Sequence, residues 1–134
     1  MLSIEQIKER LAPLFESEDI QLVLLFGSTA SGNVHKQSDI DLAFLLDTRF
    51  DVIEMTNRVT RLLRCDAVDI VDLRAAKPLL KYSAVKGGIV IYEKMAGIYN
   101  QFYSLAFRQF VDTRKLRDAR QTSINNYLKA KGLV

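Results

Sequence analysis

The sequence predicts an α/β (α+β) domain in which a small mixed β-sheet of about four strands is flanked by helices. Short apolar runs of strand length alternate with longer segments whose apolar residues recur at helical spacing. Helix-capping and turn residues stand at the junctions between these segments: Ser3, Asp51, Pro78 and Gly87-Gly88. The resulting element order, αβ-β-αβ-αβ-α, describes a sheet covered by helices.

The first helix is expected over about residues 4–16. Its apolar side chains recur at the spacing of one helix face: Ile4, Ile7, Leu11, Leu14 and Phe15. Ser3 stands where an N-cap side chain accepts a hydrogen bond from the first turn. Pro13 has no backbone N–H, so it is expected to kink this helix or to end it early.

The middle of the chain predicts three strands and one helix. Residues 20–26 and 39–46 are apolar runs that indicate buried strands. Asp51 is placed to cap a helix over about 52–64, whose apolar stripe consists of Ile53, Val59, Leu62 and Leu63. The third strand covers 67–73, and its alternation puts Asp69 and Val71 on one face and Val68, Ile70 and Asp72 on the other.

The rest of the chain predicts a short helix, a fourth strand and a long helical extension. Pro78 suits the first turn of a helix over 78–86, which Gly87-Gly88 ends. Residues 89–92 form the fourth strand, and 95–130 are helical, with a break expected near 112–113 or 121–123. We therefore divide the chain into a domain over 1–94 and a C-terminal helical extension over 95–134, which packs on the domain, on a partner, or on both.

The extension has an unusually wide apolar surface. One face is formed by Met95, Ile98, Tyr99, Phe102, Ala106 and Phe110, and Tyr103, Phe107 and Val111 widen it sideways. So wide a surface implies burial on more than one side. Folding back over the sheet and contact with a partner protein both account for it.

Length and composition indicate one compact domain of a water-soluble protein. The chain has 134 residues, of which 49% are hydrophobic and 26% charged. Its apolar runs are far shorter than the roughly 20 residues that cross a bilayer, so no membrane association is expected. The N-terminus lacks the apolar core of a signal peptide. Cys65 is the single cysteine, which excludes an intrachain disulfide and favours a cytoplasmic location.

The net charge of +3 is unevenly distributed. Residues 1–94 carry 12 Lys/Arg against 14 Asp/Glu, whereas residues 95–134 carry 7 against 2. A basic extension behind a slightly acidic domain fits an acidic partner, either protein or nucleic acid. A solvated helix face fits it equally well.

The most specific feature of the sequence lies in residues 27–41. Gly27-Ser28 and Ser38 stand at turn positions whose backbone N–H groups can bind phosphate oxygens. Asp39 and Asp41 are two residues apart at the start of a strand, so they share a face, with backbones roughly 7 Å apart. Their carboxylates are ligands that Mg²⁺ or Mn²⁺ prefers.

A third carboxylate can complete this cluster. Asp69 lies in another apolar strand, whereas the rival Asp72 points to the opposite face by alternation. Three carboxylates that hold two metal ions suit phosphoryl or nucleotidyl transfer, because the metals bind the attacking and the leaving oxygens. The third carboxylate can bind the metal that activates the acceptor hydroxyl, or it can accept the hydroxyl proton.

These residues resemble the signature of the polymerase-β nucleotidyltransferase superfamily, and specifically of the minimal nucleotidyltransferase (MNT) proteins. The similarity covers about residues 20–94: Gly27-Ser28, Ser38-Asp39-Ile40-Asp41, Val68-Asp69-Ile70-Val71 and Gly88–Glu93. The resemblance implies a polymerase-β-type fold, ATP as co-substrate, triphosphate contacts from Gly27 and Ser28, and Mg²⁺ on Asp39 and Asp41, with Asp69 as the third catalytic and metal-binding carboxylate. Many MNT proteins have arginine where this chain has Ser31, which removes one expected phosphate contact.

The resemblance also implies a partner. MNT proteins are often encoded beside a HEPN-domain ribonuclease toxin, and as antitoxins they transfer AMP from ATP to a tyrosine of that toxin. The HEPN signature Arg-x4-His-x-Tyr is absent from this chain, since Gln37 follows its single histidine, His35, by two residues. This chain is therefore expected to be the MNT partner of such a pair.

Two alternatives to this protein adenylyltransferase stay open: a binding-only antitoxin that occludes its toxin, and a nucleotidyltransferase acting on a small-molecule hydroxyl. The second normally needs a larger substrate domain than 40 residues provide. A nucleic-acid role is less favoured, because packing better explains the helical spacing of the extension's aromatic residues, although an RNA end as acceptor also stays open.

Overall fold

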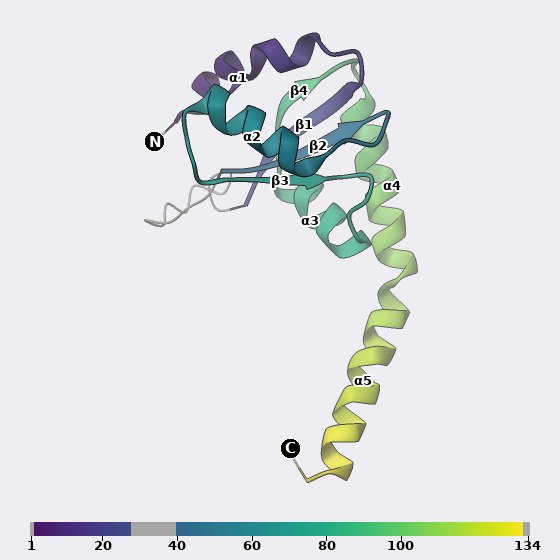
Figure 1. Ribbon diagram of the computed structural model, residues 1–134. Helices are drawn as coiled ribbons and strands as arrows, with labels where there is room; N and C mark the ends of the chain where they lie inside the picture. The colour runs from purple at the N-terminus through teal and green to yellow at the C-terminus, as the bar shows by residue number, and fades with distance from the viewer. Residues whose placement is uncertain (1, 28–39, 133–134) are drawn as a thin grey trace.

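The computed structural model describes residues 2–27 and 40–132, which form a four-stranded sheet between two layers of helices, with one helix extending away from the body (Figure 1). The strand order is β3-β2-β1-β4. The strands are β1 (Ile20–Phe26), β2 (Ile40–Leu46), β3 (Val68–Asp72) and β4 (Ile89–Glu93). Strand β1 is antiparallel to both β2 and β4, whereas β2 and β3 are parallel. The predicted mixed sheet with flanking helices is confirmed.

Helices from the first half of the chain cover one face of the sheet. They are α1 (Ile4–Leu11), the 3-10 helix η1 (Ala12–Glu16) and α2 (Val52–Leu63). Ser3 forms a capping box with Gln6, as expected of an N-cap followed by glutamine at the third helical position. The change to a 3-10 helix at Ala12, next to Pro13, confirms that the α-helix ends early. Asp51 caps α2 by accepting hydrogen bonds from the first-turn N–H groups.

Helices from the second half cover the opposite face. They are α3 (Pro78–Gly87), which runs one residue beyond the expected end at 86 and stops at the glycine pair, and α4 (Ile98–Asp112). The Tyr99 hydroxyl donates to the Val85 carbonyl at 2.8 Å and joins the two helices. Burial, and then the neighbouring Tyr103, raise the pKa of Tyr99, which favours the protonated form that donates this bond.

Residues alternate between the two helix layers along each strand. Leu42 and Phe44 of β2 pack in the core beneath α1 and α2, while Ala43 packs in the core beneath α3 and α4. Strand β3 follows the same rule, with Ile70 facing the first core and Val71 the second. The alternation predicted for the strands is confirmed, and it fixes which side chains can share a face.

The C-terminal extension consists of α4 and α5 (Arg114–Ala130), which are separated at Thr113. The break falls at the first of the two expected positions. Helix α4 begins at Ile98 rather than at 95, because Gly97 has a φ of +100° and interrupts the helical backbone. Met95 therefore lies before the helix and is 67% exposed, so its assignment to the apolar helix face is wrong. Within the described residues no side chain of α5 is buried, and no helix is long and apolar enough to cross a membrane.

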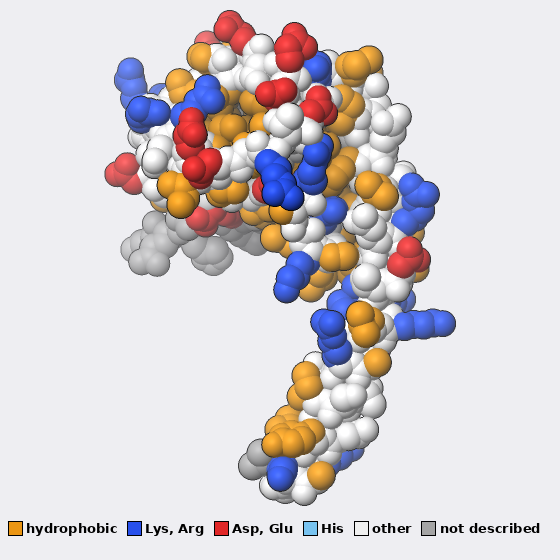
Figure 2. Space-filling model, turned by 45° about the vertical axis from the view of Figure 1, so that its right-hand side comes forward, with side chains coloured by type: hydrophobic (Ala, Val, Ile, Leu, Met, Phe, Trp, Pro, Cys, Tyr) orange, Lys and Arg blue, Asp and Glu red, His pale blue; other side chains and the backbone are white. Residues whose placement is uncertain are grey.

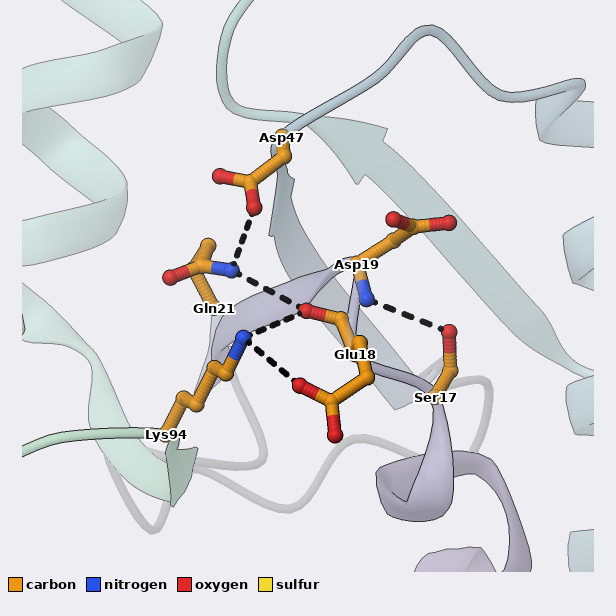
Figure 3. A network of polar contacts seen from close by, with 6 residues as sticks. All are labelled: Ser17, Glu18, Asp19, Gln21, Asp47 and Lys94. Carbon is orange, nitrogen blue, oxygen red and sulfur yellow. Dashed lines mark hydrogen bonds and ion pairs between the residues drawn. The ribbon is translucent and has the colours of Figure 1, made fainter.

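A polar network lies where β1 begins, β2 ends and β4 ends (Figure 3). Lys94 Nζ donates to the Glu18 carbonyl at 2.8 Å and pairs with the Glu18 carboxylate at 3.3 Å. Gln21 Nε2 donates to Asp47 Oδ2 at 2.8 Å. Because these groups are largely exposed, the network links the strand ends and contributes little to the free energy of unfolding.

Removal of the end of α5 should leave the body intact. A chain truncated after Asp118 retains Arg117, which donates to Thr113 Oγ1 and to the Phe110 carbonyl and so closes the end of α4. We expect a melting temperature within a degree or two of the full-length value, since α5 contributes no buried side chain. As the contrasting variant, Phe44→Ala should cost about 3–5 kcal/mol. A large loss of stability on truncation would show that α5 supports the core.

Candidate active site

Asp41 and Asp69 lie side by side at the start of two parallel strands. Asp41 is the second residue of β2, Asp69 is the second residue of β3, and the two are register partners. Neighbouring strands are about 4.8 Å apart, and registered residues of a parallel pair point to the same face. Asp41 is half-buried and Asp69 is exposed. The structure thus brings together two of the three carboxylates that the sequence singles out.

Backbone pairing between β2 and β3 fixes the relative position of Asp41 and Asp69 where the two strands begin. The Ile40 N–H donates to the Ala67 carbonyl at 2.8 Å, which joins the first residue of β2 to the residue before β3. Ile40 and Val68 are the next register pair, and both side chains are buried in the core beneath α1 and α2. Since the apolar neighbours face that core, the two aspartates must face the other way.

Gly27 provides space for the Asp41 carboxylate. It directly follows β1, whose last residue Phe26 is the register partner of Asp41. Its backbone φ is +80°, a value that residues other than glycine rarely adopt. A Cβ at this position would overlap Oδ2 of Asp41 and lie 3.1 Å from its Cγ. The glycine therefore lets the backbone after β1 approach the carboxylate closely.

This set of groups fits a divalent cation. Two carboxylates in register repel each other, and oxygen-preferring cations such as Mg²⁺ offset that repulsion. Among residues 2–27 and 40–132 no three potential metal ligands form a cluster, so the described part of the chain contributes a pair. The other expected site residues, Asp39, Ser28 and Ser38, lie outside the described residues.

The structure separates Asp72 from the pair. Asp72 is the register partner of Phe44, at the other end of β3, and its side chain accepts a hydrogen bond from the Arg74 N–H at 3.0 Å. By strand alternation it faces the opposite side of the sheet from Asp69. The preference for Asp69 over Asp72 as the neighbour of Asp41 thus agrees with the geometry.

Sequence reasoning missed one feature of this site. The Gly-Ser turn was interpreted through phosphate contacts, whereas the structure shows that Gly27 also accommodates the Asp41 carboxylate. A glycine directly after a buried strand is a signal of close backbone approach, but the strand pairing that brings Asp41 beside it is not visible in the glycine's own sequence neighbourhood.

Carboxylates in register at the start of neighbouring strands, beside a glycine turn, fit the metal-dependent chemistry of the nucleotidyltransferase class. The chain belongs to the family described as "Polymerase beta, Nucleotidyltransferase", whose model matches residues 5–96.

Two relatives share a description. A protein adenylyltransferase MntA of Aphanizomenon flos-aquae is 24% identical over 126 residues, which cover 85% of this chain and 84% of that protein. A protein adenylyltransferase MntA of Shewanella oneidensis is 40% identical over 72 residues, which cover 52% of this chain and 51% of that protein. The chain thus aligns with most of the first relative and with about half of the second.

Solved structures extend the similarity to nearly the whole chain. A crystal structure of a toxin–antitoxin with AMP-PNP matches with a TM-score of 0.73 and 28% identity, over 95% of this chain and 99% of that one. An MNT antitoxin in complex with a tri-AMPylated HEPN toxin of Shewanella oneidensis matches with a TM-score of 0.70 and 24% identity, over 94% and 98%. The second likeness shows a shared fold.

The close approach at Gly27 can be tested with two glycine-to-alanine variants. Gly27→Ala and Gly97→Ala both place a Cβ at positive φ, but among the described atoms a Cβ on Gly97 would meet nothing within 4 Å. We expect similar losses of stability, about 1–2 kcal/mol each. Calorimetric titration with AMP-PNP and Mg²⁺ should show at least about tenfold weaker binding for Gly27→Ala alone, because its Cβ displaces the Asp41 carboxylate. Equal nucleotide affinities would contradict this role of Gly27.

Proposed function

We propose that this chain is a protein adenylyltransferase antitoxin, which transfers AMP from ATP to a tyrosine of a HEPN-domain toxin. The observation that carries the proposal is the registered pair Asp41 and Asp69 in a chain that matches a toxin–antitoxin structure with AMP-PNP over nearly its whole length. The descriptions of both MntA relatives support the same activity. A binding-only antitoxin has no need of two carboxylates in register beside a glycine turn.

The proposed site combines metal ligands with a phosphate-binding turn. Asp39, Asp41 and Asp69 are the proposed ligands of Mg²⁺ or Mn²⁺, and Gly27, Ser28 and Ser38 are the proposed contacts of the triphosphate. The metal, when bound, offsets negative charge on the phosphates and on the leaving diphosphate. The backbone at Gly27 is the proposed meeting point of nucleotide and metal ligands, since its missing Cβ leaves room for the Asp41 carboxylate beside it.

The transfer step requires an in-line attack by the toxin's phenolic oxygen. This oxygen forms a bond to the α-phosphorus of ATP while the bond from that phosphorus to the bridging oxygen of the diphosphate breaks. Diphosphate leaves, and the carboxylate of Asp69 accepts the phenolic proton. The exposure of Asp69 suits this role, because an acceptor hydroxyl on another protein must reach it from outside.

We further propose a division of labour along the chain. Residues 1–94 form the catalytic unit, and the match of the family model to residues 5–96 supports that boundary. Residues 95–134 form the extension that meets the partner. We place the protein in the cytoplasm, where ATP and a ribonuclease toxin occur together.

Substitutions that remove one carboxylate charge from β2 or from β3 distinguish catalysis from simple binding. Asp41→Asn and Asp69→Asn should each reduce AMP transfer to the HEPN protein about 100-fold or more, because a lost metal ligand weakens transition-state stabilisation by several kcal/mol. Asp72→Asn is the matched control: it makes the same change on β3, the strand of Asp69, but on the face away from the pair, and should transfer AMP at nearly the wild-type rate. The added mass of AMP on the toxin, followed by mass spectrometry over time, measures the transfer.

Protection of cells distinguishes the proposed enzyme from an occluding antitoxin. The double variant Asp39→Asn/Asp41→Asn should fail to protect cells that express the toxin. If it protects as well as the wild type, neutralisation by occlusion replaces catalysis. Transfer of AMP to small-molecule hydroxyl compounds with none to the HEPN protein would favour the small-molecule enzyme.

A further inference from the structure

We infer that one face of α5 is the docking surface for the protein that receives AMP, and that docking occurs apart from the catalytic pair. This inference rests on the proposed function, since it names the surface that selects the acceptor. The docking face consists of five residues spaced four, four, three and four apart, which share one side of a helix: Leu116, Arg120, Ile124, Tyr127 and Lys131.

The docking face is exposed, with three large apolar side chains and two basic ones. The side chains of Leu116, Ile124 and Tyr127 are 54%, 52% and 61% exposed. Lys131 Nζ lies 5.7 Å from the centroid of the Tyr127 ring, which places both on the same side of the helix. Figure 2 shows hydrophobic side chains, with Lys and Arg among them, along the part of the molecule that extends from the body. Exposed apolar side chains on one helix face indicate a partner rather than a solvated helix.

The docking face begins in a groove on the body. A groove of about 420 Å³ lies between the start of α3 and the start of α5. Pro78, Leu79 and Leu116 give it apolar walls, and Lys77, Arg117 and Arg120 give it positive charge. Because Leu116 and Arg120 belong to both the groove and the docking face, the two form one continuous surface.

The sequence of α5 does not explain why this helix is stable by itself. Its second half contains Thr122, Ser123, Asn125 and Asn126, which are poor helix formers, and the helix has no side-chain N-cap hydrogen bond among the described residues. Isolated helices of this length are marginal in water, and most helical stability in proteins comes from tertiary packing. Packing against a partner supplies the tertiary contacts that stabilise α5, which the body does not provide.

Charge favours an acidic protein over a second copy of this chain. Residues 114–132 carry six Lys/Arg and one Asp, so two such helices repel each other. The apolar centre of the docking face favours a protein over a nucleic acid, whose interfaces are more polar and more strongly basic. The match to a toxin–antitoxin structure covers 95% of this chain, so most of the 17-residue α5 lies within the matched region.

The docking face is also separated from the catalytic pair. Asp69 stands at the start of β3, whereas the groove lies at the start of α3, which follows the end of β3. An acceptor that binds both must span the length of that strand, which a protein does and a small hydroxyl compound does not. Variants of the docking face should therefore weaken binding and leave the chemical step unchanged.

Two double variants with the same change in charge test the inference in the full-length protein. Ile124→Asp/Tyr127→Asp alters the docking face, and Thr122→Asp/Asn125→Asp alters the opposite face of α5. With the cognate HEPN toxin as probe, the first should bind at least about tenfold more weakly by calorimetry, and the second within about threefold of the wild type. The first should raise the KM for the toxin in AMP transfer without lowering kcat, and helix content by circular dichroism should match between the two.

The possible failures of this test are distinguishable. Equal toxin binding by the two double variants overturns the docking face, while transfer by the wild type still supports the proposed function. If the wild type binds the toxin but transfers no AMP, the proposed function is contradicted and the docking face is not. Asp41→Asn is the control for this outcome, since it should bind the toxin normally and transfer no AMP. The inference is also overturned if Ile124→Asp/Tyr127→Asp leaves toxin binding unchanged but abolishes another interaction of the wild type. Lost self-association in light scattering would assign the face to a second copy, and lost RNA binding in a gel shift would assign it to RNA.

Discussion

The parallel pairing of β2 with β3 is the constraint on which the site depends. Parallel neighbours require a crossover, and α2 supplies it by burying Met55, Val59 and Leu63 against the sheet. A slip of one residue in β3 would turn Asp69 toward that core, where an unpaired carboxylate is costly, and would place Ile70 beside Asp41. The packing that stabilises the fold therefore also sets the distance between the two catalytic candidates.

The local part of this arrangement can be predicted from the sequence, because alternation in a strand depends on adjacent residues alone. Val68, Ile70 and Val71 are enough to show that Asp69 and Asp72 face opposite sides. Register is different, since it is decided by strands that are distant in the chain, and only the structure shows Asp69 directly beside Asp41.

The sequence is likewise insufficient to predict which side chains of the C-terminal extension are buried, because burial depends on neighbours that are distant in the chain. Its apolar spacing predicts a helix but does not say which apolar residues find a neighbour. Phe102 and Ala106 are buried against α3 and the sheet, while Phe107 and Val111, on the same helix, are exposed. Folding back over the sheet, one of the two explanations left open for this apolar surface, is therefore realised by part of α4, whereas no described side chain of α5 is buried.

The separation of the docking face from the catalytic pair gives each a distinct task. The proposed site of Asp41, Asp69 and a glycine turn recognises a nucleotide and a hydroxyl, groups that many proteins share. Selectivity for one acceptor must then come from contacts remote from the reacting atoms, and such contacts act by raising the local concentration of that acceptor's tyrosine. The basic helix α5, with its exposed apolar side chains, extends from the body and provides these contacts without altering the carboxylate geometry. The same body can thus keep its chemistry while α5 alone adapts to a different toxin.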